Sequence, residues 1–247
     1  LCGDHRPGHF RGVTTVVEHT HGWPVTEPER LAEKIDHLDG RSHVDYGLVA
    51  HVWPDRLDRL AALWAGGVTY FKAFTCETHG VPAIDAATML RLARTLVTVG
   101  APCLVHCEDD HLTAAAEREL REAHRADGGI VPAWRSREAE LVSVSMVAAV
   151  ARRTGARMVV AHASNAEVLD LIARERAAGA DLVAESCPQY LHLHEDEVLR
   201  EGAFRKFTPP ARIRSEIDER QMWERLESGS IHHLSSDHAP ATREQKA

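Results

Sequence analysis

The stretch Thr69-Tyr70-Phe71-Lys72-Ala73-Phe74 places one lysine in the middle of an apolar, aromatic run. Lys72 is one of four lysines in the chain, and the other three, Lys34, Lys206 and Lys246, lie in polar sequence surroundings. Burying an ammonium group in a strand is costly, so such a lysine is usually paired, deprotonated or chemically modified. Taken alone, a strand lysine is more often a structural ion-pair partner than a functional group.

Three later strand-like segments each end in a side chain that can bind a metal ion. A histidine alone is weak evidence because the chain holds 17 of them, and Asp237 alone could be a cap or turn residue. Four such residues on four separate strands are much less expected by chance, and imidazole with carboxylate suits zinc and similar ions. The three segments are Val105-His106-Cys107-Glu108, Val160-Ala161-His162-Ala163-Ser164 and Leu234-Ser235-Ser236-Asp237-His238.

Short β-branched runs alternate with longer amphipathic segments along the chain. Strict β–α alternation indicates parallel strands joined by helical crossovers. We expect Asn165 to cap the helix that follows His162, and Pro28 to lie in the first turn of its helix. The pattern predicts strands over 12–19, 45–52, 68–74, 102–107, 157–162, 181–186 and 231–236. It predicts helices near 28–39, 55–65, 84–99, 110–125, 136–153, 165–178 and 213–228.

These elements predict an α/β fold, a (β/α)8 TIM barrel, in a single domain over residues 1–247. The candidate ligands all lie at carboxyl ends of strands, where barrel active sites are found. Seven strands are predicted, whereas a closed barrel needs eight. We therefore expect the first strand to precede Leu1, and the chain to be a piece of a longer protein that also continues beyond Ala247.

Composition narrows the class of protein. The 247 residues, 44% of them hydrophobic, can bury a full core, and a net charge of −8 without a basic patch argues against a nucleic-acid partner. No apolar stretch approaches the ~20 residues that span a membrane. The cysteines form no CxxC pair, so we expect a reduced, cytoplasmic protein. They are Cys2, Cys76, Cys103, Cys107 and Cys187.

The order of the motifs resembles one group of enzymes, the cyclic amidohydrolases of the amidohydrolase superfamily. This group contains the hydantoinases/dihydropyrimidinases, the allantoinases and the dihydroorotases. The resemblance runs from Gly12 to Pro240, and the order and spacing of the motifs are more specific than any one motif. The motifs are FKAF (71–74), VHCED (105–109), VAHAS (160–164), ESCPQYL (185–191), KFTPPAR (206–212) and SSDHAP (235–240).

The resemblance implies a role for each site residue. Lys72 would be carboxylated and would bridge two divalent metal ions, with zinc as the expected metal. His106 and His162 would bind the second metal, and Asp237 would be both a metal ligand and the general base. A hydroxide bridging the metals would attack the carbonyl, because metal binding lowers the pKa of water. Thr208 matches a position whose backbone contacts the cyclic amide.

One metal-binding pattern of this group is not found in its expected place. The first strand of these enzymes ends in an HxH pair that binds the first metal, and we expect this pair upstream of Leu1. The run His19-Thr20-His21 spells HxH, but it follows residues 12–17, which match the second strand. We interpret it as a loop that lines the mouth of the barrel, with contact to a metal as the less favoured alternative.

The resemblance indicates the class of substrate but does not identify the particular cyclic amide. FKAF is closer to the allantoinases and CPQYL to the hydantoinases, whereas Glu77 stands where hydantoinases usually carry a tyrosine. We expect a hydrolase that opens a small cyclic amide of the hydantoin, dihydropyrimidine or allantoin type and that assembles as a homodimer or homotetramer. The alternatives are a non-catalytic scaffold, or a barrel hydrolase acting on another amide or ester.

Overall fold

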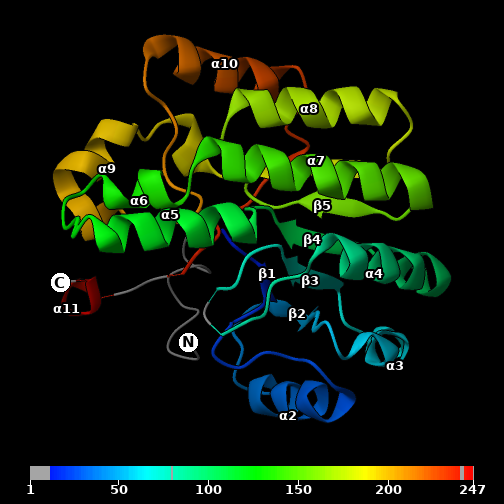
Figure 1. Ribbon diagram of the computed structural model, residues 1–247. Helices are drawn as coiled ribbons and strands as arrows, with labels where there is room; N and C mark the ends of the chain where they lie inside the picture. Colours follow the sequence, from blue (N-terminus) through cyan, green and yellow to red (C-terminus); the bar gives the residue numbers. More distant parts are fainter. Residues whose placement is uncertain (1–11, 79, 240–241, 247) are drawn as a thin grey trace.

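The computed structural model describes residues 12–78, 80–239 and 242–246. At its centre lies a sheet of seven parallel strands whose order in space follows their order in the sequence (Figure 1). Each strand falls inside a range predicted from the sequence, so the prediction of seven parallel strands is confirmed. The strands are β1 (Thr15–Glu18), β2 (Asp45–His51), β3 (Tyr70–Phe74), β4 (Cys103–His106), β5 (Met158–Val160), β6 (Leu182–Ser186) and β7 (His233–Leu234).

Helices connect the strands and form an outer layer. The crossover helices α2, α3, α4, α7, α8 and α10 pack one against the next in chain order, as the strands do. Repetition of neighbouring β–α units is the architecture of a (β/α) barrel. The helices are α2 (Pro28–Leu38), α3 (Leu60–Ala65), α4 (Ala86–Val99), α5 (Asp110–Glu122), α6 (Ile130–Trp134), α7 (Arg137–Thr154), α8 (Ala166–Ala177), α9 (Glu195–Glu201), α10 (Glu216–Glu227) and α11 (Arg243–Lys246).

Several short elements were not predicted. Helix α6 lies between the two predicted helices of the β4–β5 connection, and α9 follows β6 together with the 3₁₀ turns η2 (Pro188–Leu191) and η3 (Gly202–Arg205). Another 3₁₀ turn, η1 (Leu57–Arg59), opens α3. All are too short for a helical period to be read from the sequence. Helices α5, α6 and α9 gather at one end of the sheet, on the left of Figure 1.

Side-chain caps fix where two helices next to the candidate ligands begin. The Asn165 side chain accepts a hydrogen bond from the Val168 amide at the start of α8, and Asp109 accepts one from Leu112 at the start of α5. Pro28 occupies the first turn of α2, so the predicted roles of Asn165 and Pro28 are confirmed. Because each cap follows a candidate histidine by three residues, both strand-to-helix connections are short and held in place.

The core fills both faces of the sheet, and β4 is buried along its whole length. Parallel strands covered on both faces read as continuous apolar runs, which is why the sequence identified them. The four cysteines in the described ranges are free thiols. No helix in those ranges is long and apolar enough to cross a bilayer.

Lys34 is buried although its neighbours in the sequence are polar. This residue lies on the inner face of α2 with Leu31 and Leu38, and only 3% of its surface is exposed. Its ammonium lies 2.5 Å from the Glu18 carboxylate and donates a hydrogen bond to the Trp23 carbonyl at 2.9 Å. The polar neighbours in the sequence hide this burial, because residues three and four apart share one helix face.

Candidate metal centre

Lys72 lies in the buried strand β3, and only 3% of its surface is exposed. Its ammonium makes no hydrogen bond or ion pair with any of the described residues, and Nζ lies 5.1 Å from the centre of the Phe74 ring. Burial lowers the pKa of Lys72, although the negative charges of Glu185 and Asp237 oppose this shift. A neutral amine is the form that can become a carbamate, so these surroundings favour the predicted modification.

His106 and His162 meet at the ends of β4 and β5. Nδ1 of His106 lies 2.9 Å from Nε2 of His162, and both residues are buried. Two nitrogen atoms bound to one zinc ion at ~2.0–2.1 Å each lie roughly 3 Å apart. Burial, together with the nearby His106 and Lys72, lowers the pKa of His162 well below its usual value. His162 is therefore neutral at physiological pH, and the two ring nitrogens lie at a separation suited to one metal ion.

A carboxylate holds the second nitrogen of His106. Nε2 of His106 lies 2.8 Å from Oε2 of Glu108, which also accepts a hydrogen bond from Nη1 of Arg135 at 3.0 Å. Because Arg135 donates to the same oxygen, Glu108 acts as an acceptor here, so Nε2 of His106 donates to it and Nδ1 is the nitrogen that faces His162. The matching nitrogen of His162, Nδ1, has no hydrogen-bond partner among the described residues.

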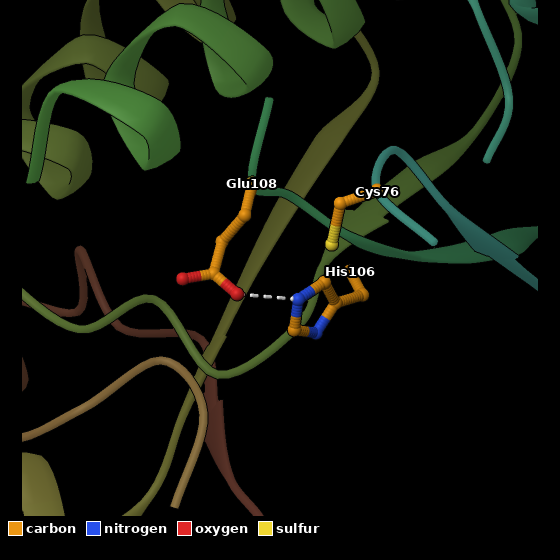
Figure 2. Close-up of side chains that lie close together, drawn as sticks. All are labelled: Cys76, His106 and Glu108. Atoms are coloured by element: carbon orange, nitrogen blue, oxygen red, sulfur yellow. Dashed lines mark hydrogen bonds and ion pairs between the residues drawn. The ribbon is translucent and has the colours of Figure 1, made fainter. Parts of the chain in front are cut away.

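Figure 2 shows a second group of potential ligands around His106. Cys76, His106 and Glu108 are buried and each offers one ligand atom within 4.8 Å of the others. Nη1 of Arg135, however, donates to Sγ of Cys76 at 2.8 Å as well as to Glu108. Burial raises the pKa of Cys76 to about 12, so its thiol stays protonated. Because a guanidinium in contact with both groups repels a cation, we assign this cluster to the support of His106.

His162 and Asp237 share an unusual backbone conformation. Their φ angles are +40° and +46°, in the left-handed region that few residues other than glycine adopt. His162 lies just past the end of β5, and Asp237 lies just past the end of β7. Strain of this kind concentrates at functional sites, where the surrounding structure holds it in place.

Glu185 of β6 places a negative charge next to His162 and His233. Its Oε1 accepts from the His162 amide at 3.2 Å, and its Oε2 lies 3.1 Å from Nε2 of His233. Burial opposes ionisation of Glu185, but the His233 hydrogen bond and the charge of Lys72 outweigh it and lower the pKa. Asp237 has an exposed surface, yet the protein around it desolvates the carboxylate and raises its pKa, against the opposing charge of Lys72.

Thr208 lies half-buried in the loop 206–212, and its peptide bond to Pro209 is cis. The Tyr190 hydroxyl donates a hydrogen bond to the Pro209 carbonyl at 2.7 Å. The Tyr190 ring also contacts Phe207, with 5.6 Å between the ring centres. The loop that is expected to contact the substrate is therefore anchored on the η2 turn after β6.

A second set of histidines lies at the ends of β1 and β2. The His21 ring is edge-on to His51, with 5.6 Å between centres, and to Phe74, with 5.0 Å. Burial, followed by the charge of Lys72, lowers the pKa of His19 to about 4. His51 is buried, and neither of its ring nitrogens has a hydrogen-bond partner in the described part of the chain. This position fits the interpretation of His19 and His21 as residues that line the mouth of the barrel.

Sequence reasoning missed the residues that support the candidate ligands. Glu108 follows His106 by two residues inside a recognised motif, so a signal was present. Arg135 gives no local signal, because it lies 27 residues from Glu108. His51 ends a predicted strand, as the candidate ligands do, but no motif singled it out.

The chain is similar to several known proteins, although no protein-family model matches it. It is 32% identical to an allantoinase of Rubrobacter xylanophilus over 227 residues, which are 91% of this chain and 49% of that protein. It is 37% identical to an allantoinase of Desulfitobacterium hafniense over 205 residues, 81% of this chain and 44% of that protein. Its fold matches an L-hydantoinase (dihydropyrimidinase) from Arthrobacter aurescens with a TM-score of 0.86 and 26% identity, over 92% of this chain and 51% of that one.

Over most of its length the chain is therefore similar to cyclic amidohydrolases. Its likeness to the hydantoinase confirms the TIM-barrel class predicted for this chain. The chain spans about half the length of the curated relatives it matches. The roles of Lys72, His106, His162, Asp237 and Thr208 stay predictions, because similarity to these proteins does not by itself assign them.

Proposed function

We propose that this chain belongs to a cyclic amidohydrolase, which opens a cyclic amide ring by hydrolysis with two divalent metal ions. The observation that carries the proposal is the 2.9 Å approach of His106 Nδ1 and His162 Nε2. The buried Lys72, with no charged partner among the described residues, lies on the neighbouring strand β3. A strand-end histidine pair beside a buried lysine whose pKa is lowered is a donor set that fits the metal centre expected from the sequence.

Four residues would hold the metal ions. Lys72, as a carbamate, would bridge them, His106 and His162 would bind one of them, and Asp237 would add a carboxylate oxygen. Zinc suits this mixture of nitrogen and oxygen ligands. The bound ions would lower the pKa of water toward neutrality and polarise the carbonyl oxygen of the substrate.

Asp237 would move the proton during the reaction. Desolvation raises its pKa, which brings the protonated and ionised forms of the carboxyl closer in energy near neutral pH. As a base it would accept the proton of the attacking water, and as an acid it would deliver that proton to the leaving amide nitrogen. The backbone of Thr208, in the loop anchored by Tyr190, would hold the amide in place.

Allantoin is the first candidate among the cyclic amides. The two allantoinases share 32% and 37% identity with the chain, whereas the L-hydantoinase shares 26%. Glu77, at the position where hydantoinases usually carry a tyrosine, is exposed. Hydantoins and dihydropyrimidines are the second candidates. We further propose a cytoplasmic homodimer or homotetramer, on the strength of the resemblance.

The test is to assay the full-length protein on allantoin, hydantoin, dihydrouracil and dihydroorotate, with zinc or manganese supplied. Turnover of one of these rings supports the proposal and identifies the substrate. Two bound metal ions without turnover of any of them would favour a barrel hydrolase that acts on another amide or ester. A wild-type protein that binds no metal would favour the non-catalytic scaffold.

A further inference from the structure

Arg212 is one of the largest fully buried side chains among the described residues, with 1% of its surface exposed. It ends the loop 206–212, which also carries Thr208. A guanidinium has five N–H donors and cannot be deprotonated, so a buried arginine needs partners for both its donors and its charge. Those partners show which parts of the molecule Arg212 holds together.

One side of the guanidinium is tied to the backbone in front of α7. Nη2 donates to the Ser136 carbonyl at 3.1 Å, and Nη1 donates to the Arg135 carbonyl. Ser136 caps α7 through its side chain. The Arg135 side chain in turn donates to Glu108, the carboxylate that holds His106.

Two buried carboxylates balance the charge of Arg212. Oε1 of Glu108 lies 3.8 Å from Nη2, and Oε2 of Glu140 lies 3.9 Å from Nε. The other oxygen of Glu108 is the one in contact with Nε2 of His106. Because Oε1 of Glu108 has no hydrogen-bond partner among the described residues, the charge of Arg212 is an important part of its stabilisation.

Arg212 also reaches the segment that follows His162. Its Nε donates to Oγ of Ser164 at 3.3 Å, and the Ser164 amide donates to Glu140 at 2.9 Å. Ser164 follows His162 by two residues, as Glu108 follows His106. One guanidinium therefore contacts the equivalent position after each of the two candidate ligands.

We infer that Arg212 couples the substrate loop to the histidine pair. Its contacts link the position of the loop 206–212 to the orientation of His106 and His162. The inference rests on the proposed metal centre and adds the residue through which substrate binding and metal binding influence each other. A metal ion that fixes both histidines would also restrain the loop, and the reverse holds because coupling between sites is reciprocal.

Arg212 acts here as a positioning residue, because it would touch neither the metal nor the substrate. Lysine cannot replace it in this role. A single ammonium cannot reach Ser136, Glu108 and Ser164 at once, whereas the planar guanidinium presents donors on three sides. Arg212→Lys therefore keeps the charge and removes the connection.

Hydrogen exchange on the full-length protein tests the coupling without any substrate. In the wild type, zinc is expected to slow amide exchange in peptides covering 206–212 by about fivefold or more, the lower end of the usual range for coupled sites. In Arg212→Lys zinc should still bind, while most of this slowing is lost. The absorption spectrum of the cobalt(II) protein, which reports ligand geometry, should change in the same variant.

Arg214→Lys is the matched control. Arg214 stands two residues further along, is exposed, and pairs with Glu195 at 3.0 Å, so both measurements should match the wild type. Glu108→Gln is the second variant. It keeps an oxygen for His106 Nε2 and removes the charge opposite Arg212. It should therefore also reduce the slowing of amide exchange in the loop 206–212 that zinc causes. Melting curves show whether each variant is folded. If Arg212→Lys does not fold, the loop exchange measured for Glu108→Gln decides whether the coupling exists.

The outcomes separate the coupling from the metal centre. Zinc-bound Arg212→Lys, or zinc-bound Glu108→Gln, that slows loop exchange as much as the wild type would overturn the coupling alone. A wild-type protein that binds zinc without any change in loop exchange would do the same. A wild-type protein that binds no zinc would overturn the proposed metal centre and the coupling with it.

Discussion

Lys34 and Lys72 are equally buried, with 3% of each residue exposed, but their surroundings are opposite. The Lys34 ammonium lies 2.5 Å from the Glu18 carboxylate and donates to a backbone carbonyl. Lys72 has neither kind of partner among the described residues, and burial lowers its pKa. Burial alone therefore does not mark a functional lysine. What distinguishes Lys72 from Lys34 is the absence of a direct ion pair or hydrogen bond among the described residues, since Glu185 and Asp237 act on Lys72 only through their charges.

The largest effect is expected from Lys72→Ala. Loss of the bridging ligand should abolish two-metal occupancy and turnover of the full-length protein, as measured by metal analysis and by assay on its best substrate. Added acetate or propionate should restore part of both, because a free carboxylate can take the place of the carbamate. Lys34→Ala is the control and should keep two metal ions. A structure determined with metal that shows unmodified Lys72 paired with a carboxylate would contradict the assignment.

The next largest effect is expected from Asp237→Asn, which changes a residue whose pKa is coupled to Lys72. Loss of general acid–base catalysis typically lowers the rate ~10²–10⁴-fold, and the loss of ligand charge would add to this. The fold and at least one metal ion should remain, as checked by circular dichroism and metal analysis. A variant that keeps more than about a tenth of the wild-type rate would show that Asp237 is not the proton shuttle.

A smaller effect, on stability and not on turnover, is expected from Lys34→Met. The variant leaves Glu18 without its partner, and breaking a buried ion pair costs roughly 3 kcal/mol or more. Urea unfolding of the metal-free protein measures this loss. The double variant Lys34→Met with Glu18→Gln should recover part of it, because no charge is then left uncompensated. Equal stability of the single variant and the wild type would show that Lys34 is dispensable to the fold.

The smallest effect is expected in the pH dependence of stability, as a difference between the wild type and Lys72→Met. The folded-state pKa of Lys72 lies below the ordinary value of 10.5, so between these two values its side chain binds more protons in the unfolded chain than in the folded protein. In the metal-free protein Lys72 therefore contributes a rise of stability with pH through that window. Buried thiols such as Cys76 and Cys103, whose pKa burial raises to about 12, contribute a fall of stability with pH in both proteins. The slope of the wild type minus the slope of Lys72→Met, from urea unfolding series between neutral and alkaline pH, should therefore be positive. Equal slopes would mean that Lys72 stays protonated in the fold.

The sequence predicted the strands and the strand-end residues because both are local signals. Each strand is a short β-branched or aromatic run; Lys72 lies within one of these runs, and His106, His162 and Asp237 stand at or just past the ends of others. The short helix α9 and the 3₁₀ turns were missed because three to seven residues carry no readable period.

The contacts that hold the candidate ligands in place could not be predicted from local sequence in the same way. Arg135 contacts Glu108 across 27 residues of sequence, and Arg212 contacts the Arg135 carbonyl across 77. Only the fold brings these segments together, so no sequence motif predicts the contacts. Lys34 is different, because its spacing from Leu31 and Leu38 did contain the signal of a buried helix face.

The left-handed backbone at His162 and Asp237 has a consequence for protein engineering. Glycine is the residue best suited to φ angles of +40° and +46°, so an exposed corner such as Asp237 can gain stability by losing its side chain. If Asp237 has the proposed catalytic role, directed evolution for heat resistance alone would select against the carboxylate that the reaction needs. Selection for thermostability on this scaffold would then require a screen for activity in every round, because stability and turnover would compete at the same residue.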